Sequence, residues 1–148
     1  MPFTDTYANN VLDFLFAKTT SLSAPSAVYI GLCSNDPEAD NGAITELSGN
    51  GYSRVMISQK GQTYPDVMGS ASGRMIQNTK QINWTKATGD WPEAKGFFLS
   101  SSPTVGEKTA IFFYGKLDEP YPTCAAGAVA LFDPYTLKIS FPASDTTA

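Results

Sequence analysis

Histidine is absent from the 148 residues of this chain, and with it the commonest general base and metal ligand of proteins. Its absence excludes catalytic sites of the Ser-His-Asp and Cys-His types. The glycine-rich loops that cradle phosphates in nucleotide-binding proteins are also missing. The only two cysteines, Cys33 and Cys124, are too few for a thiolate zinc site. We therefore expect no cofactor, no resident metal and no enzymatic activity, and we expect both thiols to be free and buried.

Basic residues are few and scattered. Ten Lys and Arg against fourteen Asp and Glu give a net charge of −4, and no stripe of bases is present to neutralise phosphates. Nucleic acid and anionic membranes are therefore not expected as partners. The longest apolar run near the start, VLDFLFA, is interrupted by Asp13 and is too short to span a bilayer. Because MPFTDTYANN carries an acid and no base, it does not resemble a signal peptide, and we expect the protein to stay in the cytoplasm where it is made.

What the chain does have is the composition of a folded domain, with 42% hydrophobic and 16% charged residues. Its length predicts a single domain over residues 1–148. Residues 4–18, TDTYANNVLDFLFAK, predict an amphipathic helix with a wide apolar arc. A helix this short is marginal in water, so it must pack on a sheet or on a neighbouring subunit. We take the following side chains as a candidate assembly surface: Phe3, Tyr7, Val11, Phe14 and Leu15.

From residue 26 to residue 141 the sequence alternates between short strand-like segments and turns that contain Gly and Pro. The predicted strands are AVYIGL, YSRVMIS, RMIQNTKQINW, AKGFFLS, AIFFYGKL, AVALFD and LKISF. The last two are predicted to form a hairpin over 132–141, with its turn at Asp133-Pro134. One helix followed by many strands predicts a mainly β fold, an antiparallel β-sandwich or jelly-roll-like domain with one N-terminal helix. Residues 142–148 are expected to fray.

Acidic residues suggest two candidate sites, a calcium loop and a two-carboxylate hydrolytic site. Asp36, Glu38 and Asp40 alternate at a spacing that can direct oxygens at a calcium ion. The register of a calcium loop fails, because Gly42 comes one place late and Leu47 stands where the bidentate glutamate belongs, so a solvated acidic loop is favoured. A two-carboxylate hydrolase would need a pair of acids. The sequence gives no preference among Glu46, Asp66, Asp90, Glu93, Asp118 and Glu119.

Glu46 and Arg54 flank the turn LSGNGYS. Two interpretations stay open for them. They can meet across a hairpin as a structural ion pair, or they can remain two solvent-facing charges that contribute about 0–1 kcal/mol.

Aromatic residues cluster in INW, DWPEAKGFF and IFFYG, and most of them are expected in the core. Trp91 is the best candidate for an exposed aromatic contact, because Pro92 leaves a strand edge unpaired. A carbohydrate-binding module would use such rings as stacking faces. The candidates for that role are Trp84, Trp91, Tyr64 and Tyr121.

The chain resembles the small tail-fibre-like or minor tail proteins of tailed bacteriophages. An E-x-SG-x-GY-x-R element, here ELSGNGYSRV at 46–55, is the most specific part of the resemblance. The chain departs from the family pattern at SSSPTVGEK, where a short glycine-containing turn is usual, and at Ala128, where an acidic or polar residue is common. The other matching segments, in order, are NNVLDFLF at 9–16, VYIGLCSNDP at 28–37, NTKQINWTKATGDWPEAKGFFL at 78–99 and the region 111–141.

The resemblance implies a non-enzymatic virion component that is present in many copies and contacts itself and other virion proteins. It further implies assembly in the cytoplasm of the bacterial host. We favour a tail-associated position over capsid decoration, and closed symmetry such as a trimer or hexameric ring is the default for such assemblies. A carbohydrate-binding host-attachment module stays open as an alternative function.

Overall fold

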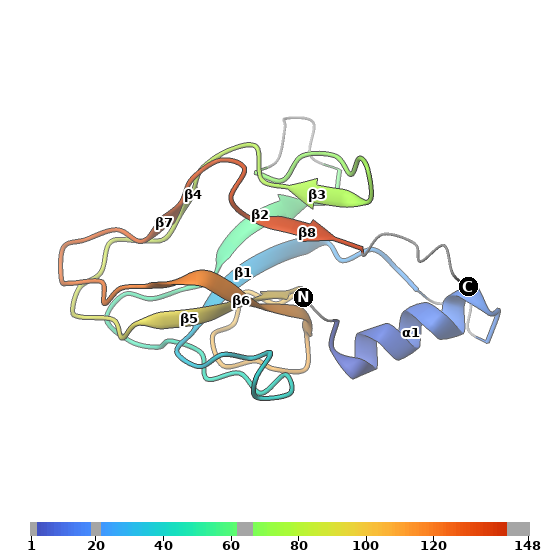
Figure 1. The fold of residues 1–148 in the computed structure, drawn as a ribbon, viewed down its shortest axis with the longest axis horizontal. Helices are drawn as coiled ribbons and strands as arrows, with labels where there is room; N and C mark the ends of the chain where they lie inside the picture. The colour runs from blue at the N-terminus through green and yellow to red at the C-terminus, as the bar shows by residue number, and fades with distance from the viewer. Residues whose placement is uncertain (1–2, 19–21, 62–66, 142–148) are drawn as a thin grey trace.

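The computed structural model describes residues 3–18, 22–61 and 67–141 (Figure 1). Among these residues a four-stranded antiparallel sheet has the strand order β2-β1-β5-β6, and two further antiparallel pairs join β3 to β8 and β4 to β7. The predicted fold class, mainly β with antiparallel sheets and one N-terminal helix, is confirmed. The elements are α1 (Asp5–Leu15), β1 (Ala27–Cys33), β2 (Val55–Gln59), β3 (Met75–Gln77), β4 (Ile82–Asn83), β5 (Ala94–Ser100), β6 (Ile111–Tyr121), β7 (Leu131–Phe132) and β8 (Lys138–Ser140).

The four-stranded sheet and the two small strand pairs share one hydrophobic core. Alternate residues of β1 and β5 point into it, and the facing layer contributes Ile82, Trp84 and Leu137. The opposite face of the four-stranded sheet carries a smaller cluster beneath the loop that follows β1. That cluster consists of Cys33, Ile44, Phe98 and Ile111.

The predicted hairpin over 132–141 is wrong in its pairing. β7 pairs with β4, and β8 pairs with β3, so the Asp133-Pro134 turn connects two different strand pairs. The single strand predicted over 74–84 is divided in the same way, into β3 and β4. The connection from β3 to β4 and the connection from β7 to β8 each pass from one strand pair to the other, and the two connections lie side by side.

Asn78, which is completely buried, holds the two crossings together. Its amide nitrogen donates to the carbonyl oxygens of Lys80 at 2.8 Å and Asp133 at 2.9 Å. Its amide oxygen accepts the backbone N–H of Leu137 at 2.9 Å. One side chain therefore satisfies three backbone groups from two crossing segments, as a buried amide must if its burial is not to destabilise the fold.

Asn78→Ala should lower the free energy of unfolding by about 2–4 kcal/mol, because it leaves three backbone groups without their side-chain partner. Denaturant unfolding followed by tryptophan fluorescence measures the change. Asn83→Ala, at an exposed position of β4, is the control and should change stability by less than about 0.5 kcal/mol. Equal losses of stability in the two variants would show that the hydrogen bonds of Asn78 do not stabilise the two connections between the strand pairs.

Both cysteines are free and buried, as predicted. Burial raises the pKa of the Cys33 thiol to about 12, and the carboxylate of Asp36 adds to the shift. The thiolate is the reactive form of cysteine, so Cys33 should resist a thiol reagent such as DTNB in the folded protein at mildly alkaline pH and react at once in guanidinium. Equal rates in the two conditions would contradict the burial.

Candidate functional site

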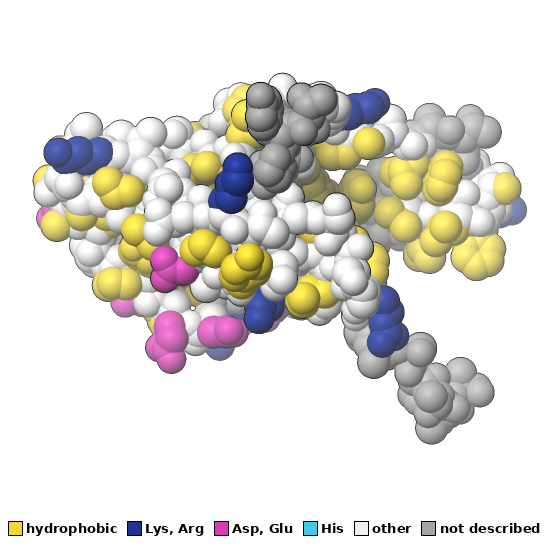
Figure 2. Space-filling model, turned by 90° about the horizontal axis from the view of Figure 1, so that it is seen from above, with side chains coloured by type: hydrophobic (Ala, Val, Ile, Leu, Met, Phe, Trp, Pro, Cys, Tyr) yellow, Lys and Arg dark blue, Asp and Glu magenta, His cyan; other side chains and the backbone are white. Residues whose placement is uncertain are grey.

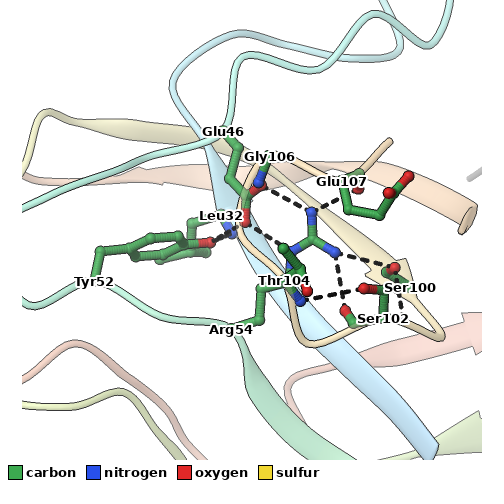
Figure 3. Close-up of polar contacts among 9 residues, drawn as sticks. All are labelled: Leu32, Glu46, Tyr52, Arg54, Ser100, Ser102, Thr104, Gly106 and Glu107. Atoms are coloured by element: carbon green, nitrogen blue, oxygen red, sulfur yellow. Dashed lines mark hydrogen bonds and ion pairs between the residues drawn. The ribbon is translucent and has the colours of Figure 1, made fainter. Parts of the chain in front are cut away.

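Glu46 and Arg54 form a buried ion pair (Figure 3). The backbone of Glu46 pairs with that of Cys33 of β1 in an isolated antiparallel β-bridge, and Arg54 immediately precedes β2. The Nε of Arg54 donates to Oε1 of Glu46 at 2.8 Å, and its Nη2 donates to Oε2 at 2.9 Å. The side chains of Arg54 and Glu46 are only 0% and 5% exposed. Of the two interpretations of these charges, the structure therefore has the ion pair, in the bidentate geometry that strengthens such contacts.

Arg54 also binds the loop that follows β5. Its Nη1 donates to the hydroxyl of Ser100 at 3.1 Å and to the carbonyl of Ser102 at 2.9 Å, and its Nη2 donates to the carbonyl of Glu107 at 2.8 Å. All five N–H groups of the guanidinium thus have a partner. A buried cation is tolerated only under such conditions, so the network fixes this loop to the sheet.

Tyr52 completes the network around the carboxylate. Its hydroxyl donates to Oε1 of Glu46 at 3.2 Å and accepts the backbone N–H of Leu32 at 2.9 Å. The backbone N–H of Gly106 donates to Oε2 at 2.7 Å. Burial, reinforced by the neighbouring carboxylate, raises the pKa of Tyr52, so the phenol stays protonated and remains a donor.

The turn between Glu46 and Arg54 requires left-handed backbone at three successive residues. Gly49, Asn50 and Gly51 have φ angles of 73°, 51° and 81°, a conformation that Gly and Asn adopt most readily. The carbonyl of Asn50 accepts the indole N–H of Trp91 at 2.8 Å and the backbone N–H of Thr88 at 2.9 Å. The ELSGNGYSRV element therefore builds a docked turn and a buried ion pair, which is a structural role.

α1 begins at the N-cap Thr4 and ends three residues before the predicted boundary. Beyond Leu15 the chain turns at Ala17, whose φ angle is 57°, and the N–H of Lys18 donates to the carbonyl of Asp13 at 2.7 Å. This pattern is a Schellman motif, which stops a helix by satisfying its last carbonyl groups.

The N-terminal end fastens α1 to the sheet. The N–H of Thr4 donates to the carbonyl of Phe112 at 3.0 Å. The ring of Phe3 packs on that of Phe113, and the ring of Tyr7 packs on that of Phe112, each with 5.2 Å between centroids. Phe3 and Tyr7, two of the predicted assembly residues, are thus used to anchor the helix on β6 of the same chain.

The rest of α1 projects from the sheet with its apolar side chains uncovered (Figures 1 and 2). No residue of the helix is buried. Of the remaining predicted assembly residues, Val11 is half-buried, whereas Phe14 and Leu15 are exposed. We call the following four residues the apolar end of α1: Leu12, Phe14, Leu15 and Phe16, which are 53%, 44%, 67% and 72% exposed.

A family model described as "Podophage GP4 fiber I protein gp80" matches residues 2–140 of this chain. The chain belongs to this family. A comparison with curated proteins finds no match. The predicted resemblance to phage tail-fibre-like proteins is therefore confirmed, and the family identifies a structural protein of the phage virion.

Trp91 of this gp80-family chain is not the exposed aromatic contact that the sequence predicts. It is 2% exposed and packs edge-on against Tyr52, with 5.5 Å between the ring centroids. Its backbone N–H donates to the carbonyl of Cys124 at 2.9 Å. The prediction fails because Pro92 does not leave this position unpaired: Trp91 itself bridges to Cys124.

Of the other predicted stacking residues, Trp84 is also buried. It is 2% exposed and packs against Phe132. Tyr121 is half-buried, and its hydroxyl accepts the N–H of Leu131 at 3.3 Å. Tyr64 lies outside the described residues. The two tryptophans therefore provide no face for a carbohydrate.

Several of the acidic candidates accept hydrogen bonds within the chain. Both carboxylate oxygens of Glu46 are bound within the ion-pair network. In the loop after β1, Oδ1 of Asp36 accepts the N–H of Glu38, and Oδ2 of Asp40 accepts the amide of Asn35. The part of the chain that the structure describes contains no group of three His, Cys, Asp or Glu placed to hold a metal ion. Asp66 lies outside the described residues.

No helix among the described residues is both long and apolar enough to cross a membrane.

Proposed function

We propose that this gp80-family protein is a non-enzymatic, tail-associated component of the phage virion, and that several copies assemble through α1. The observation that carries the proposal is the apolar end of α1, where four large side chains are exposed on a helix without any buried residue.

The exposed helix is costly for an isolated chain. Burial of a side chain such as Leu or Phe contributes about 1.5–3 kcal/mol, and a contiguous apolar patch on a soluble protein commonly marks an interaction site. A short helix gains most of its stability from packing, yet here only the N-terminal part is anchored on β6. A second protein surface over the apolar end would supply the missing packing.

The interior supports a structural role for the rest of the domain. The element that carries the family resemblance is used for internal bracing, since Arg54 satisfies all its donors within the chain. The assembly surface and the bracing network thus occupy different parts of the molecule.

Multi-angle light scattering of the purified protein over a concentration series tests the assembly. We expect a mass that is a whole multiple of the monomer mass and that persists on dilution. A protein that stays monomeric at every concentration, and that does not bind particles lacking it, would overturn the proposal.

The tail position is tested separately, on phage particles. Gold-labelled antibodies seen by electron microscopy should decorate the tail, and quantitative mass spectrometry should find several copies for each particle. Decoration of the head, at a copy number close to that of the capsid protein, would instead support the alternative of a capsid decoration protein.

A further inference from the structure

An apolar groove of about 200 Å³ opens beside the anchored start of α1. Its floor is formed by core residues of both layers, including Ile57, Met68 and Leu99, and its rim by half-buried side chains, including Phe3, Ile76 and Ile139. We call this site the apolar groove. Apart from Ser58, every residue that lines it is hydrophobic.

The size and chemistry of the groove suit the apolar end of α1. An apolar cavity of roughly 150 Å³ accepts a benzene ring, so the groove can accept the ring of Phe14 together with part of a neighbouring side chain. An amphipathic helix laid into a hydrophobic groove is a recurrent mode of recognition, in which residues spaced by three or four positions act as anchors. Val11, Phe14 and Leu15 have this spacing.

The helix cannot reach the groove of its own chain. Phe3 forms part of the rim, and α1 leaves the sheet directly after it and runs outward (Figure 1). At a rise of 1.5 Å per residue, Phe14 lies about 14 Å along the helix from its first residue. The groove and the apolar end that matches it are therefore held apart within one chain.

Charge complements the apolar match. α1 carries Asp5 and Asp13 and no base within its own bounds. Strand β6 lines the groove with Phe112 and Phe113, and its two acids, Asp118 and Glu119, lie further along the strand. Four of the other segments that line the groove, residues 27–33, 55–61, 67–77 and 137–141, contain no acid and carry three exposed bases. These bases are Lys60, Arg74 and Lys138. Opposite charges on two surfaces favour their encounter and disfavour wrong partners.

We infer that the apolar end of α1 from one copy seats in the apolar groove of a second copy. The inference rests on the proposed function, in that it names the receptor surface for the assembly proposed there. Because the described part of each chain contributes one α1 and one apolar groove to this contact, it builds a reciprocal two-fold exchange, a closed ring or, where the rotation does not close, a filament. Assembly through a bundle of α1 helices is the competing arrangement.

Photocrosslinking distinguishes the two arrangements. The photoreactive residue p-benzoylphenylalanine replaces Phe14, which it resembles in ring and polarity, and the variant is mixed with isotopically labelled wild-type chains before irradiation. We expect links between a light and a heavy chain, mapped by mass spectrometry to residues 55–61, 67–77 or 137–141. Links confined to α1 of the second copy, to any segment of the same chain, or to the tail 142–148 would overturn the inference.

A pair of charge substitutions provides an independent readout. Ile76→Glu places a charge on the rim of the groove and should weaken assembly at least 100-fold. Val129→Glu makes the same change at an exposed position in the segment between β6 and β7. That segment reaches the end of the molecule opposite to α1 (Figure 1), so the substitution should leave assembly unchanged within about 3-fold. Circular dichroism checks that both variants fold, and equal effects on assembly would count against the groove.

The outcomes separate this inference from the proposed function. An oligomer whose links from position 14 avoid the groove overturns the inference and leaves the assembly intact. A protein that never forms an oligomer overturns both.

Discussion

Arg54→Met should lower the free energy of unfolding by about 3–5 kcal/mol, because it leaves the carboxylate of Glu46 buried without its counter-charge. It also removes the donors that bind the carbonyl groups of Ser102 and Glu107. Since small domains are stable by only about 5–15 kcal/mol, this substitution brings the protein close to unfolding. It should also increase hydrogen exchange in residues 101–110, which the guanidinium holds to the sheet.

Lys116→Met is the matched control for this experiment. Lys116 forms the surface ion pair with Asp36, at 3.7 Å and with the lysine side chain 59% exposed, so its loss should cost about 0–1 kcal/mol. The double substitution Glu46→Met with Arg54→Met should be less destabilised than the sum of the two single variants, because no unpaired charge is left. Urea unfolding measures the wild-type protein, the three single variants and the double variant, and an Arg54→Met effect no larger than that of Lys116→Met would refute the role of the network.

Phe14→Asp should abolish self-association and leave the domain folded. In an assembled state the substitution loses the burial of the ring, worth about 1.5–3 kcal/mol, and places a charge in an apolar interface. A combined loss of at least about 3 kcal/mol of binding free energy raises the dissociation constant more than 100-fold. In the isolated chain Phe14 is 44% exposed on a helix with no buried residue, so the free energy of unfolding should change by only about 0.5 kcal/mol.

Sedimentation velocity measures the association in this second experiment, and circular dichroism with urea unfolding measures the fold. Thr6→Asp serves as the control, because it adds the same charge to an exposed position on the side of α1 that faces away from the apolar end. If Phe14→Asp unfolds the protein, the helix packs mainly on its own sheet. If the variant assembles as well as wild type, another surface holds the copies together.

These two experiments address two separate parts of the molecule. The network around Arg54 stabilises the β domain from within, and the apolar end of α1 is available to a neighbour. A virion component needs both, because a rigid body must present a contact surface that repeats identically from copy to copy. Loss of the Arg54 network should lower the stability of the fold, and loss of the apolar end of α1 should weaken self-association alone.

Local patterns in the sequence were sufficient to predict several elements of secondary structure. The spacing of apolar residues predicted the helix, and its end differed by three residues because the left-handed turn at Ala17 carries no glycine to signal it. The strand AKGFFLS was predicted with the bounds that β5 has. The strand pairing at the C-terminus was predicted wrongly, because the buried amide of Asn78 acts between segments that are far apart in the sequence.

The candidate site was predicted only in outline. Glu46 and Arg54 were recognised as a possible pair, yet nothing local indicated that Arg54 would also bind Ser100, Ser102 and Glu107, which follow about fifty residues later. Trp91 was predicted to be exposed, because its bridge to Cys124 is also a long-range contact. The apolar groove had no sequence signal, since its lining comes from segments separated along the whole chain.

The sequence by itself determined the absence of a histidine-based catalytic site, the amphipathic helix, the β-rich class and the family resemblance, because each depends on composition or on neighbours along the chain. The tertiary structure decided which charges are buried, which aromatic rings are covered and that the apolar end of α1 is left uncovered. Burial depends on which distant segments pack together, and that is set by the whole fold.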